Sequence, residues 1–415
     1  MIKSILSSIQ FHYEIVFAPF LAERVRWVLW PLYALCKAFR LCFVVNIVST
    51  TGHIVVELDY FFRALFLKDI DPGKRYVWLK KPEAYSLACA KLYSDRFWLC
   101  FCNRFIYLLF LPITMAFPDI IFDAGISRLK WQLPKKRKYK EFDRGASYLH
   151  QISKEEGLAR MTEYYRKLKR SPEKFPLKET SFADNRLKEL VSIDGKKVAL
   201  IHVKDIVRNA IALPTDPNTY LGALKYLRNS GYCLIFVGRE KMPPIFKQYG
   251  IVNYAESEIA DFYHDLHLFS IAEIALISAS GISVLADCMD VPYLYLNSWH
   301  LSVPPFSKKS ISIPALMKRS SGGWVSFAEQ NRIYKTLADV GPENFPHGEY
   351  IPRNASEEEI LMAVKELEAL KNTQTSPPLT TLQSQFKYLD PASPLFYAES
   401  RCCDFFLLQH KALCG

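Results

Sequence analysis

Residues 277–292 combine apolar, small and hydroxyl-bearing residues in an order that suits the binding of an anion. Ile277-Ser-Ala-Ser-Gly281 predicts a buried strand that ends in a turn, and a short helix and a second strand at Pro292 follow. Such a turn presents hydroxyls and backbone N–H groups at a helix N-terminus, where a phosphate binds well. The candidate ligands of the anion are Ser278, Ser280, Gly281 and Ser283. The alternative is that Gly281 only permits a tight turn, and Asp287 would face either the site or solvent.

Two further loops carry cations directly after apolar strands. His202-Val-Lys204-Asp205, with Arg208 beyond it, follows one strand, and Gly238-Arg239 follows the next. Lysine and arginine neutralise a diphosphate, and arginine does so through paired hydrogen bonds. We expect Lys204, Arg208, Gly238 and Arg239 to bind the same anion as the Ser/Gly turn. The alternatives are a surface ion-pair cluster and an ordinary turn with an exposed arginine.

A fourth loop, near the beginning of the chain, offers a candidate general base. Gly52-His53 follows an apolar strand, and Glu57 lies one helical turn after His53 on the same face. An imidazole at this point can accept a proton from a hydroxyl or donate to a phosphate. We expect His53 to be catalytic, with Glu57 as its partner or substitute. The alternative is a helix cap with a structural carboxylate beside it.

The strands and helices that position these loops alternate along the chain. We predict strands at 41–49, 198–203, 232–237, 251–254, 271–277 and 292–296, with helices at 54–67, 218–229, 243–249, 258–269, 281–289 and 356–370. Alternation of this kind predicts an α/β fold with parallel sheets and ligands at the carboxyl ends of the strands. We expect four regions: an amphipathic segment at 1–40, an acceptor-side domain at 41–190, a donor-binding domain at 191–372 and an extension at 373–415 that packs back on the body.

Composition indicates an anionic partner and a reducing compartment. The chain has 415 residues, half of them hydrophobic, and a net charge of +11. Its ten cysteines form no C-x-x-C pair and no spacing suited to zinc. We expect reduced thiols, no signal peptide and a cytoplasmic location. The triplet Asp69-Ile-Asp71 is interpreted as a loop, and we expect no metal site.

The first 48 residues mix aromatic and basic residues, among them Trp27, Trp30 and Arg26. No stretch of about 20 residues is free of charge, so an interfacial amphipathic helix is favoured over a membrane span. Residues 97–117 form a second apolar stretch, which we expect to be interrupted at Pro112. This stretch predicts a buried helix, an interfacial helix or a membrane-spanning helix. The basic run at 130–140, with Trp131 and Tyr139, is either a solvated loop or a contact with anionic headgroups. For the apolar segments, the alternative to membrane contact is burial in the core of the protein. No nucleic-acid-binding motif accompanies the basic residues, so we expect no nucleic-acid partner.

The residues around Gly281 also resemble a known family. Gly281-Ile-Ser-Val-Leu-Ala-Asp-Cys-Met-Asp-Val-Pro292 resembles the donor-side element of bacterial GT-B glycosyltransferases, of the heptosyltransferase-like and fucosyltransferase-like kinds. Asp290 stands where that family usually has glycine, so the turn there is expected to differ. His202-Val-Lys204 resembles the family's H-x-R motif with lysine in place of arginine, and Gly52-His53 resembles its acceptor-side turn.

The resemblance implies two Rossmann-like domains in a GT-B architecture, a nucleotide-sugar donor and inverting transfer without a metal or other cofactor. With the aromatic and basic N-terminus, it predicts a glycosyltransferase of surface-polysaccharide synthesis, peripheral on the inner membrane, that acts on a glycan or lipid-linked acceptor. Motifs of P-loop nucleotidases, nicotinamide dehydrogenases and ordinary α/β-hydrolases are missing from the sequence. The alternatives are a non-catalytic binding protein with a degenerate fold of this type and a transferase of a phosphosugar or pyruvyl group.

Overall fold

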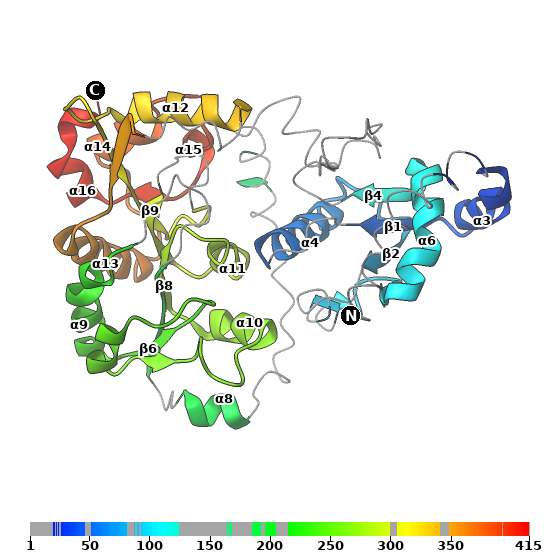
Figure 1. Cartoon of the computed structure of the whole chain (residues 1–415), viewed down its shortest axis with the longest axis horizontal. Helices are drawn as coiled ribbons and strands as arrows, with labels where there is room; N and C mark the ends of the chain where they lie inside the picture. Colours follow the sequence, from blue (N-terminus) through cyan, green and yellow to red (C-terminus); the bar gives the residue numbers. More distant parts are fainter. Residues whose placement is uncertain are drawn as a thin grey trace. The chain divides into compact units, whose positions relative to one another are not determined.

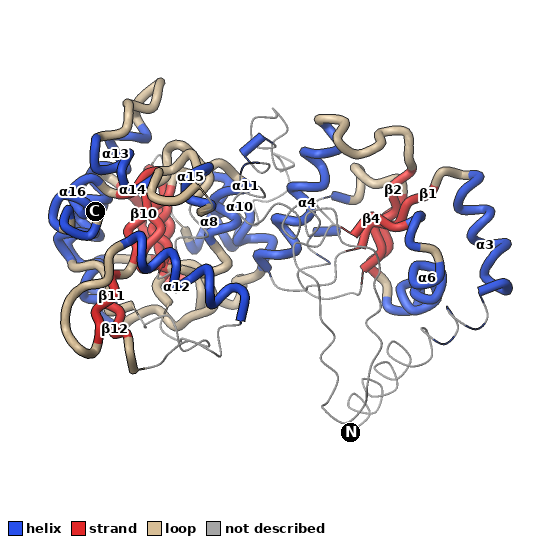
Figure 2. The backbone as a smooth tube through the Cα atoms, turned by 90° about the horizontal axis from the view of Figure 1, so that it is seen from above, coloured by secondary structure: helices blue, strands red, loops and turns tan. Residues whose placement is uncertain are grey.

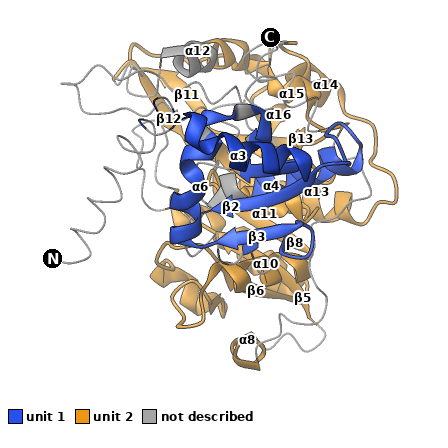
Figure 3. Ribbon diagram, turned by 90° about the vertical axis from the view of Figure 1, so that its right-hand side faces the viewer, with its two compact units in different colours: residues 1–155, 171–176 blue, residues 156–170, 177–415 orange. Residues whose placement is uncertain are grey.

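The computed structural model divides the chain into two units (Figure 3). Unit 1 comprises residues 1–155 and 171–176, and unit 2 comprises residues 156–170 and 177–415. The sequence-based boundary was drawn between 190 and 191. The described residues are 20, 22, 24, 26–45, 51–80, 87, 89–90, 93–123, 163, 166–167, 185–191, 196–204, 215–298, 305–340, 348–391 and 393–414. Of residues 45, 51–54, 115, 118, 123 and 334–340, only the backbone is described.

Unit 1 is built on a four-stranded parallel sheet of order β3-β2-β1-β4. Its elements are α3 (Arg26–Ala38), β1 (Leu41–Val45), α4 (Thr51–Phe66), β2 (Arg75–Lys80), β3 (Leu99–Cys102), α6 (Arg104–Ala116), η2 (Pro118–Ile120) and β4 (Ile121–Asp123). Side chains alternate across a strand, so Tyr76 contacts Phe61 of α4 whereas Val77 packs with α3 and α6. Helix α4 therefore covers one face of the sheet, and α3 and α6 cover the other (Figure 1).

Residues 97–117 form a strand and a helix, not the single helix that the sequence predicted. Strand β3 ends at Cys102, and the Asn103 side chain accepts hydrogen bonds from the backbone N–H groups of Phe105 and Ile106, which starts α6. Pro112 lies inside α6 and does not break it. Burial of Ile113 and Ala116 against the sheet stabilises the helix beyond the proline. Among the described residues, no helix is both long enough and apolar enough to cross a bilayer.

Unit 2 is built on a seven-stranded parallel sheet of order β13-β10-β9-β8-β5-β6-β7. The strands are β5 (Lys197–His202), β6 (Tyr232–Phe236), β7 (Val252–Asn253), β8 (Ile274–Ser278), β9 (Tyr293–Ser298), β10 (Ile311–Pro314) and β13 (Arg401–Cys402). An antiparallel pair, β11 (Leu316–Arg319) and β12 (Tyr350–Arg353), follows β10. The five strands that the sequence predicted here all form. Figure 2 shows the strands of this unit flanked by helices.

Helices cover both faces of the large sheet. They are α8 (Asn185–Leu190), η3 (Pro217–Tyr220), α9 (Leu221–Asn229), η4 (Pro244–Tyr249), α10 (Phe262–Ile271), α11 (Ser283–Cys288), α12 (Phe327–Val340), α13 (Glu357–Lys371), α14 (Thr381–Lys387), α15 (Pro394–Tyr397), α16 (Asp404–Gln409) and η6 (Lys411–Leu413). Helices α9 and α13 pack together over one face, and α10 and α11 pack together over the other (Figure 1). The capping box of Ser356 and Glu359 that the sequence predicted begins α13.

The segment 373–415 contributes to the core of unit 2. Strand β13 pairs with β10 at one edge of the sheet, and Phe386 and Phe406 are buried in the cluster that also contains Phe327. Within this segment, two capped helices, α14 and α15, lead from α13 to β13. The segment is thus part of the fold of the unit and not an appended tail.

Truncation of Phe406 tests this role. Phe406→Ala should lower the free energy of unfolding by about 3–5 kcal/mol, because it removes a fully buried ring and leaves a cavity. Leu408→Ala, two residues away in α16, is the matched control, since Leu408 is exposed and should change stability by less than about 0.5 kcal/mol. Urea unfolding measures both, and equal effects would contradict the assignment of α16 to the core.

Candidate functional site

The central strands of unit 2 create the point at which parallel sheets usually bind ligands. The chain runs from β5 outward through β6 to β7, and then returns to β8 on the other side of β5. The carboxyl ends of β5 and β8 therefore lie side by side, and their following loops diverge. Ligands of open α/β sheets bind outside the strands at such a switch point. His202 ends β5 and Lys204 follows it, while Ser278 ends β8.

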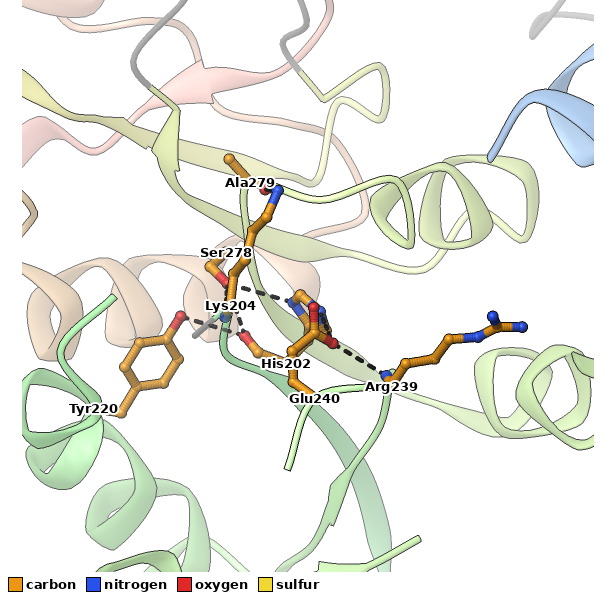
Figure 4. Close-up of polar contacts among 7 residues, drawn as sticks. All are labelled: His202, Lys204, Tyr220, Arg239, Glu240, Ser278 and Ala279. Carbon is orange, nitrogen blue, oxygen red and sulfur yellow. Dashed lines mark hydrogen bonds and ion pairs between the residues drawn. The ribbon is translucent and has the colours of Figure 1, made fainter. Parts of the chain in front are cut away.

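Hydrogen bonds join the two loops at this edge (Figure 4). The buried Ser278 hydroxyl oxygen accepts a hydrogen bond of 2.7 Å from the backbone N–H of Lys204. The Lys204 ammonium donates to the carbonyl oxygen of Ala279 at 3.4 Å. The β5 loop is thereby fixed against the β8 loop, and a positive charge is held beside the turn 279–283.

The turn 279–283 has donors to offer an anion. The Ser283 hydroxyl and backbone N–H both donate to the Ser280 carbonyl oxygen, which closes the turn ahead of α11. Among the described residues, none accepts a hydrogen bond from the backbone N–H groups of Ser280, Gly281 and Ile282. Three consecutive N–H groups and one ammonium are therefore available within one loop pair.

Gly281 is not required for the turn itself. Its φ does not lie in the left-handed region, and a Cβ built on it meets no atom within 4 Å. The alternative that Gly281 only permits a tight turn is therefore not favoured by the geometry. The space that a Cβ of residue 281 would occupy is open.

A second network links the β6 loop to the same edge. His202 is buried, and its Nε2 lies 3.1 Å from Glu240 Oε2, whereas its Nδ1 lies 3.4 Å from the Ser278 oxygen. Burial alone would raise the pKa of Glu240, but the hydrogen bond and charge of His202 and the Arg239 backbone N–H lower it to about 2. Glu240 is therefore a carboxylate at neutral pH. From the sequence, His202 was named as part of a motif but given no role of its own, and Glu240 was not singled out.

Gly238 serves this network through its conformation. Its φ is 113°, in the region that glycine favours, and an added Cβ would lie 2.7 Å from His202 Cδ2 and 2.9 Å from Glu240 Oε2. The glycine lets the backbone pass close to the histidine ring. A side chain at this position would meet His202 and Glu240, and the predicted role of Gly238 in donor binding stays a prediction.

Arg239 follows Gly238, but its guanidinium extends away from Lys204 (Figure 4). Its charge acts on Asp265 in α10: burial raises the pKa of Asp265 to about 7, while the Tyr254 hydrogen bond and the Arg239 charge act in the opposite direction. Asp265 is thus a titratable group near the carboxyl end of β6 that the sequence analysis missed. The loop that carries Arg239 is part of the site, and its guanidinium lies apart from the Lys204 ammonium.

Asp287 and Asp290 turn out to be structural. Asp287 is buried, and its carboxylate accepts hydrogen bonds from the Tyr293 hydroxyl and the Phe306 backbone N–H, so it faces neither the site nor solvent. Asp290 has a φ of 57°. This is a left-handed conformation, which aspartate tolerates better than most residues. The expectation that the turn differs from that of the family stays a prediction.

Unit 1 places His53 after β1 in the first turn of α4. Strand β1 lies between β2 and β4, so the start of α4 follows the switch point of the smaller sheet. The backbone of His53 is described and its side chain is not. Glu57 is fully buried in α4, so its carboxylate can act only through another group of the protein. Its predicted partnership with His53 stays a prediction.

Some predicted groups lie elsewhere. Asp205 and Arg208 are outside the described residues, as is the basic run at 130–140. Asp71, in a loop after α4, pairs with Arg40 and accepts the Gly73 backbone N–H. In the described parts of the chain, no three His, Cys, Asp or Glu side chains are grouped so as to hold a metal ion.

No protein-family model and no curated protein matches the chain. Among solved structures, it resembles the family 9 glycosyl transferase of Veillonella parvula DSM 2008, with 12% identity and a TM-score of 0.44, over 79% of this chain and 97% of that one. The heptosyltransferase WaaC of E. coli, with ADP-2-deoxy-2-fluoro heptose, matches at 12% identity and a TM-score of 0.35, over 72% and 100%. The iron-containing dodecameric glycosyltransferase TibC of enterotoxigenic E. coli H10407 matches with 12% sequence identity and a TM-score of 0.38. The match covers 64% of this chain, and this chain spans only 60% of the length of TibC. Because all three TM-scores are below 0.5, we argue the function below from the chain's own residues.

Substitution of Gly238 tests the network at the sheet edge. Gly238→Ala should destabilise unit 2 by about 1–3 kcal/mol, because alanine is strained at this φ and its methyl group displaces the His202 ring. Gly281→Ala is the matched control, with open space and no left-handed φ. Thermal unfolding compares the two variants, and equal melting temperatures would show that the His202–Glu240 contact does not constrain the loop.

Proposed function

We propose that the chain is a glycosyltransferase that takes a sugar from a nucleotide-sugar donor bound to unit 2. The observation that carries this proposal is the position of Lys204. Its ammonium lies 3.4 Å from Ala279 O, beside three consecutive backbone N–H groups, at the switch point of a parallel sheet. A diphosphate needs one strong cation and several fixed donors, and this loop pair provides both.

In this reaction, the site would stabilise the leaving group. When a sugar leaves a nucleoside diphosphate, negative charge develops on the diphosphate oxygens. Donors that are already fixed in place stabilise that charge without reorganisation. The Ser278 hydrogen bond fixes the Lys204 backbone, and the Ser283–Ser280 hydrogen bonds fix the turn. Arg208 and the Arg239 loop are proposed to bind other parts of the donor.

The acceptor is proposed to bind unit 1, with His53 as the general base. His53 follows the switch point of the smaller sheet, which supports a ligand-facing position for this residue. A histidine is suited to accept the acceptor hydroxyl proton at neutral pH as the bond to the sugar forms. We propose a glycan or lipid-linked acceptor, inverting transfer and no metal, as the sequence resemblance implies.

Two other functions compete with this proposal. A non-catalytic binding protein would hold the nucleotide but transfer nothing. A transferase of a phosphosugar or pyruvyl group would use the same anion site and yield a product of different mass. Mass analysis of the product separates these alternatives.

Donor binding depends on Lys204 if the proposal is right. Lys204→Ala should weaken the binding of nucleoside diphosphates by about 10- to 100-fold, because one charge-assisted hydrogen bond is lost. Gly281→Ala should also weaken binding, since its methyl group enters the space above the turn, while leaving stability unchanged. Calorimetric titration with UDP, GDP, ADP and CDP identifies the base and measures the loss.

The control is Lys225→Ala, which removes an exposed cation from α9, a helix that does not carry the loops of the site. It should bind the nucleotide as the parent does. Retention of full affinity by both Lys204→Ala and Gly281→Ala would place the diphosphate elsewhere and remove the main support for the proposal.

The role of His53 is tested by turnover. His53→Ala should lower kcat by about 100-fold or more, the usual contribution of a general base, and leave the donor dissociation constant unchanged. The glutamine of the His53→Gln variant is polar but not basic, so this variant should lose as much transfer activity as His53→Ala. A His53→Ala enzyme with full transfer activity would exclude this residue from the reaction.

A further inference from the structure

Helix α3 of unit 1 has an apolar surface on the side that faces away from the sheet. The side chains of Trp27, Trp30 and Leu35 are 75%, 59% and 52% exposed, and Val28, Leu32 and Phe39 add to the same outward surface. The inner side of the helix is apolar as well, because Leu29, Tyr33 and Cys36 pack against the core of unit 1. A helix at the surface of a globular protein normally has charged or polar residues on its outer face. Helix α3 has large hydrophobic residues there instead.

Neighbouring elements extend this apolar surface. Helix α6 packs against α3 on the same face of the sheet and exposes Phe105 and Leu109, which lie one turn apart on one side of the helix (Figure 1). Trp98 and Leu99, at the start of the edge strand β3, are exposed too. We call the exposed residues of α3 and α6 the α3/α6 face. Exposed hydrophobic residues gathered on two helices that pack together point to an interaction site, because single exposed hydrophobic residues are common and groups of them are not.

Basic residues accompany the α3/α6 face. Arg24 and Arg26 lie at the beginning of α3, and Lys37 and Arg40 at its end, all exposed. Lys37 and Arg40 also contact Asp119 and Asp71, but both pairs are solvent-exposed, so they contribute little energy. Arg26 lies 4.7 Å from the centre of the Phe117 ring. Tryptophan and arginine side by side are typical of segments at the headgroup level of a bilayer.

The charge of the whole chain is concentrated in this unit. Residues 1–155 contain 23 Lys and Arg against 13 Asp and Glu, so they carry +10 of the total +11. The remaining 260 residues are almost neutral. An anionic surface attracts such a unit, each basic residue near it contributing about 1 kcal/mol. A second copy of the same unit, also at +10, would be repelled.

We propose that the α3/α6 face is a docking surface for an anionic lipid bilayer, with the α3 aromatic residues in the headgroup region and the basic residues on lipid phosphates. The proposal names the surface and the kind of partner, and it does not depend on the transferase chemistry of unit 2. Binding would hold unit 1 at the membrane surface through the exposed side chains of α3 and α6.

Vesicle binding by the full chain, without any nucleotide, tests the proposal. The parent should sediment with vesicles of phosphatidylcholine and phosphatidylglycerol (7:3) and at least tenfold less with phosphatidylcholine alone. The triple variant Trp27→Ser, Trp30→Ser, Leu35→Ser should bind the anionic vesicles at least tenfold more weakly. These three side chains are exposed, so the variant should keep the parent's unfolding transition.

The matched control removes exposed hydrophobic residues from unit 2. Trp324→Ser with Leu408→Ser changes side chains that are 43% and 56% exposed and should leave vesicle binding unchanged. Failure of the parent to bind anionic vesicles, or equal binding by the triple variant, would overturn the proposal. A dimer in sedimentation velocity that only the triple variant abolishes would assign the face to a second copy and would overturn it as well.

Discussion

The 2.7 Å hydrogen bond from the Lys204 backbone to the Ser278 hydroxyl is the contact on which the candidate site depends. It connects two loops that are 74 residues apart in the chain but adjacent in space, because β5 and β8 are neighbours in the sheet. A buried donor without an acceptor costs about 1–3 kcal/mol, so the serine also satisfies a backbone group that the end of β5 would otherwise leave unpaired. Every other feature of the site is placed relative to this junction.

From this junction, polar contacts extend in both directions. On one side, His202 bridges the Ser278 hydroxyl and the Glu240 carboxylate, and the close packing of Gly238 makes room for its ring. On the other side, the Lys204 ammonium reaches the turn before α11, which Ser283 closes. The result is three loops with fixed relative positions and an open space over Gly281. Rigid loops around an open space are what preorganised binding of a charged ligand requires.

Unit 1 repeats the same topology on a smaller scale and differs from unit 2 in its surface. Its outer helices α3 and α6 bury one side against the sheet and expose large hydrophobic side chains on the other. Inside α4, Asp59 and Arg63 form a buried ion pair one turn apart, next to the buried Glu57. Unpairing such charges in the interior costs several kcal/mol, so this pair restricts how α4 can pack. The two units thus combine one type of sheet with different exteriors.

The sequence alone determined the strands and helices of unit 2 that carry strong local signals. Apolar runs followed by Gly or charged residues gave β5, β6, β8 and β9, and Ser356 with Glu359 gave the start of α13, because these patterns are local in the chain. Short strands such as β4 and β13 were missed, since two or three residues carry too little periodicity. Pro112 was misjudged because packing against the sheet outweighs the local preference of proline.

The choice among candidate site residues was made only by the tertiary structure. The sequence placed Lys204, Arg239 and Ser280 on equal terms and left open whether Asp287 faces the site or solvent. The fold brings Lys204 to the 279–283 turn, directs Arg239 toward α10 and buries Asp287 beneath Tyr293. Strand order decides which loops meet, and strand order comes from burial of the whole sheet, not from any one segment. The residue types that suit anion binding could therefore be identified from the sequence. Which of them lie together depended on which strands became neighbours in the sheet.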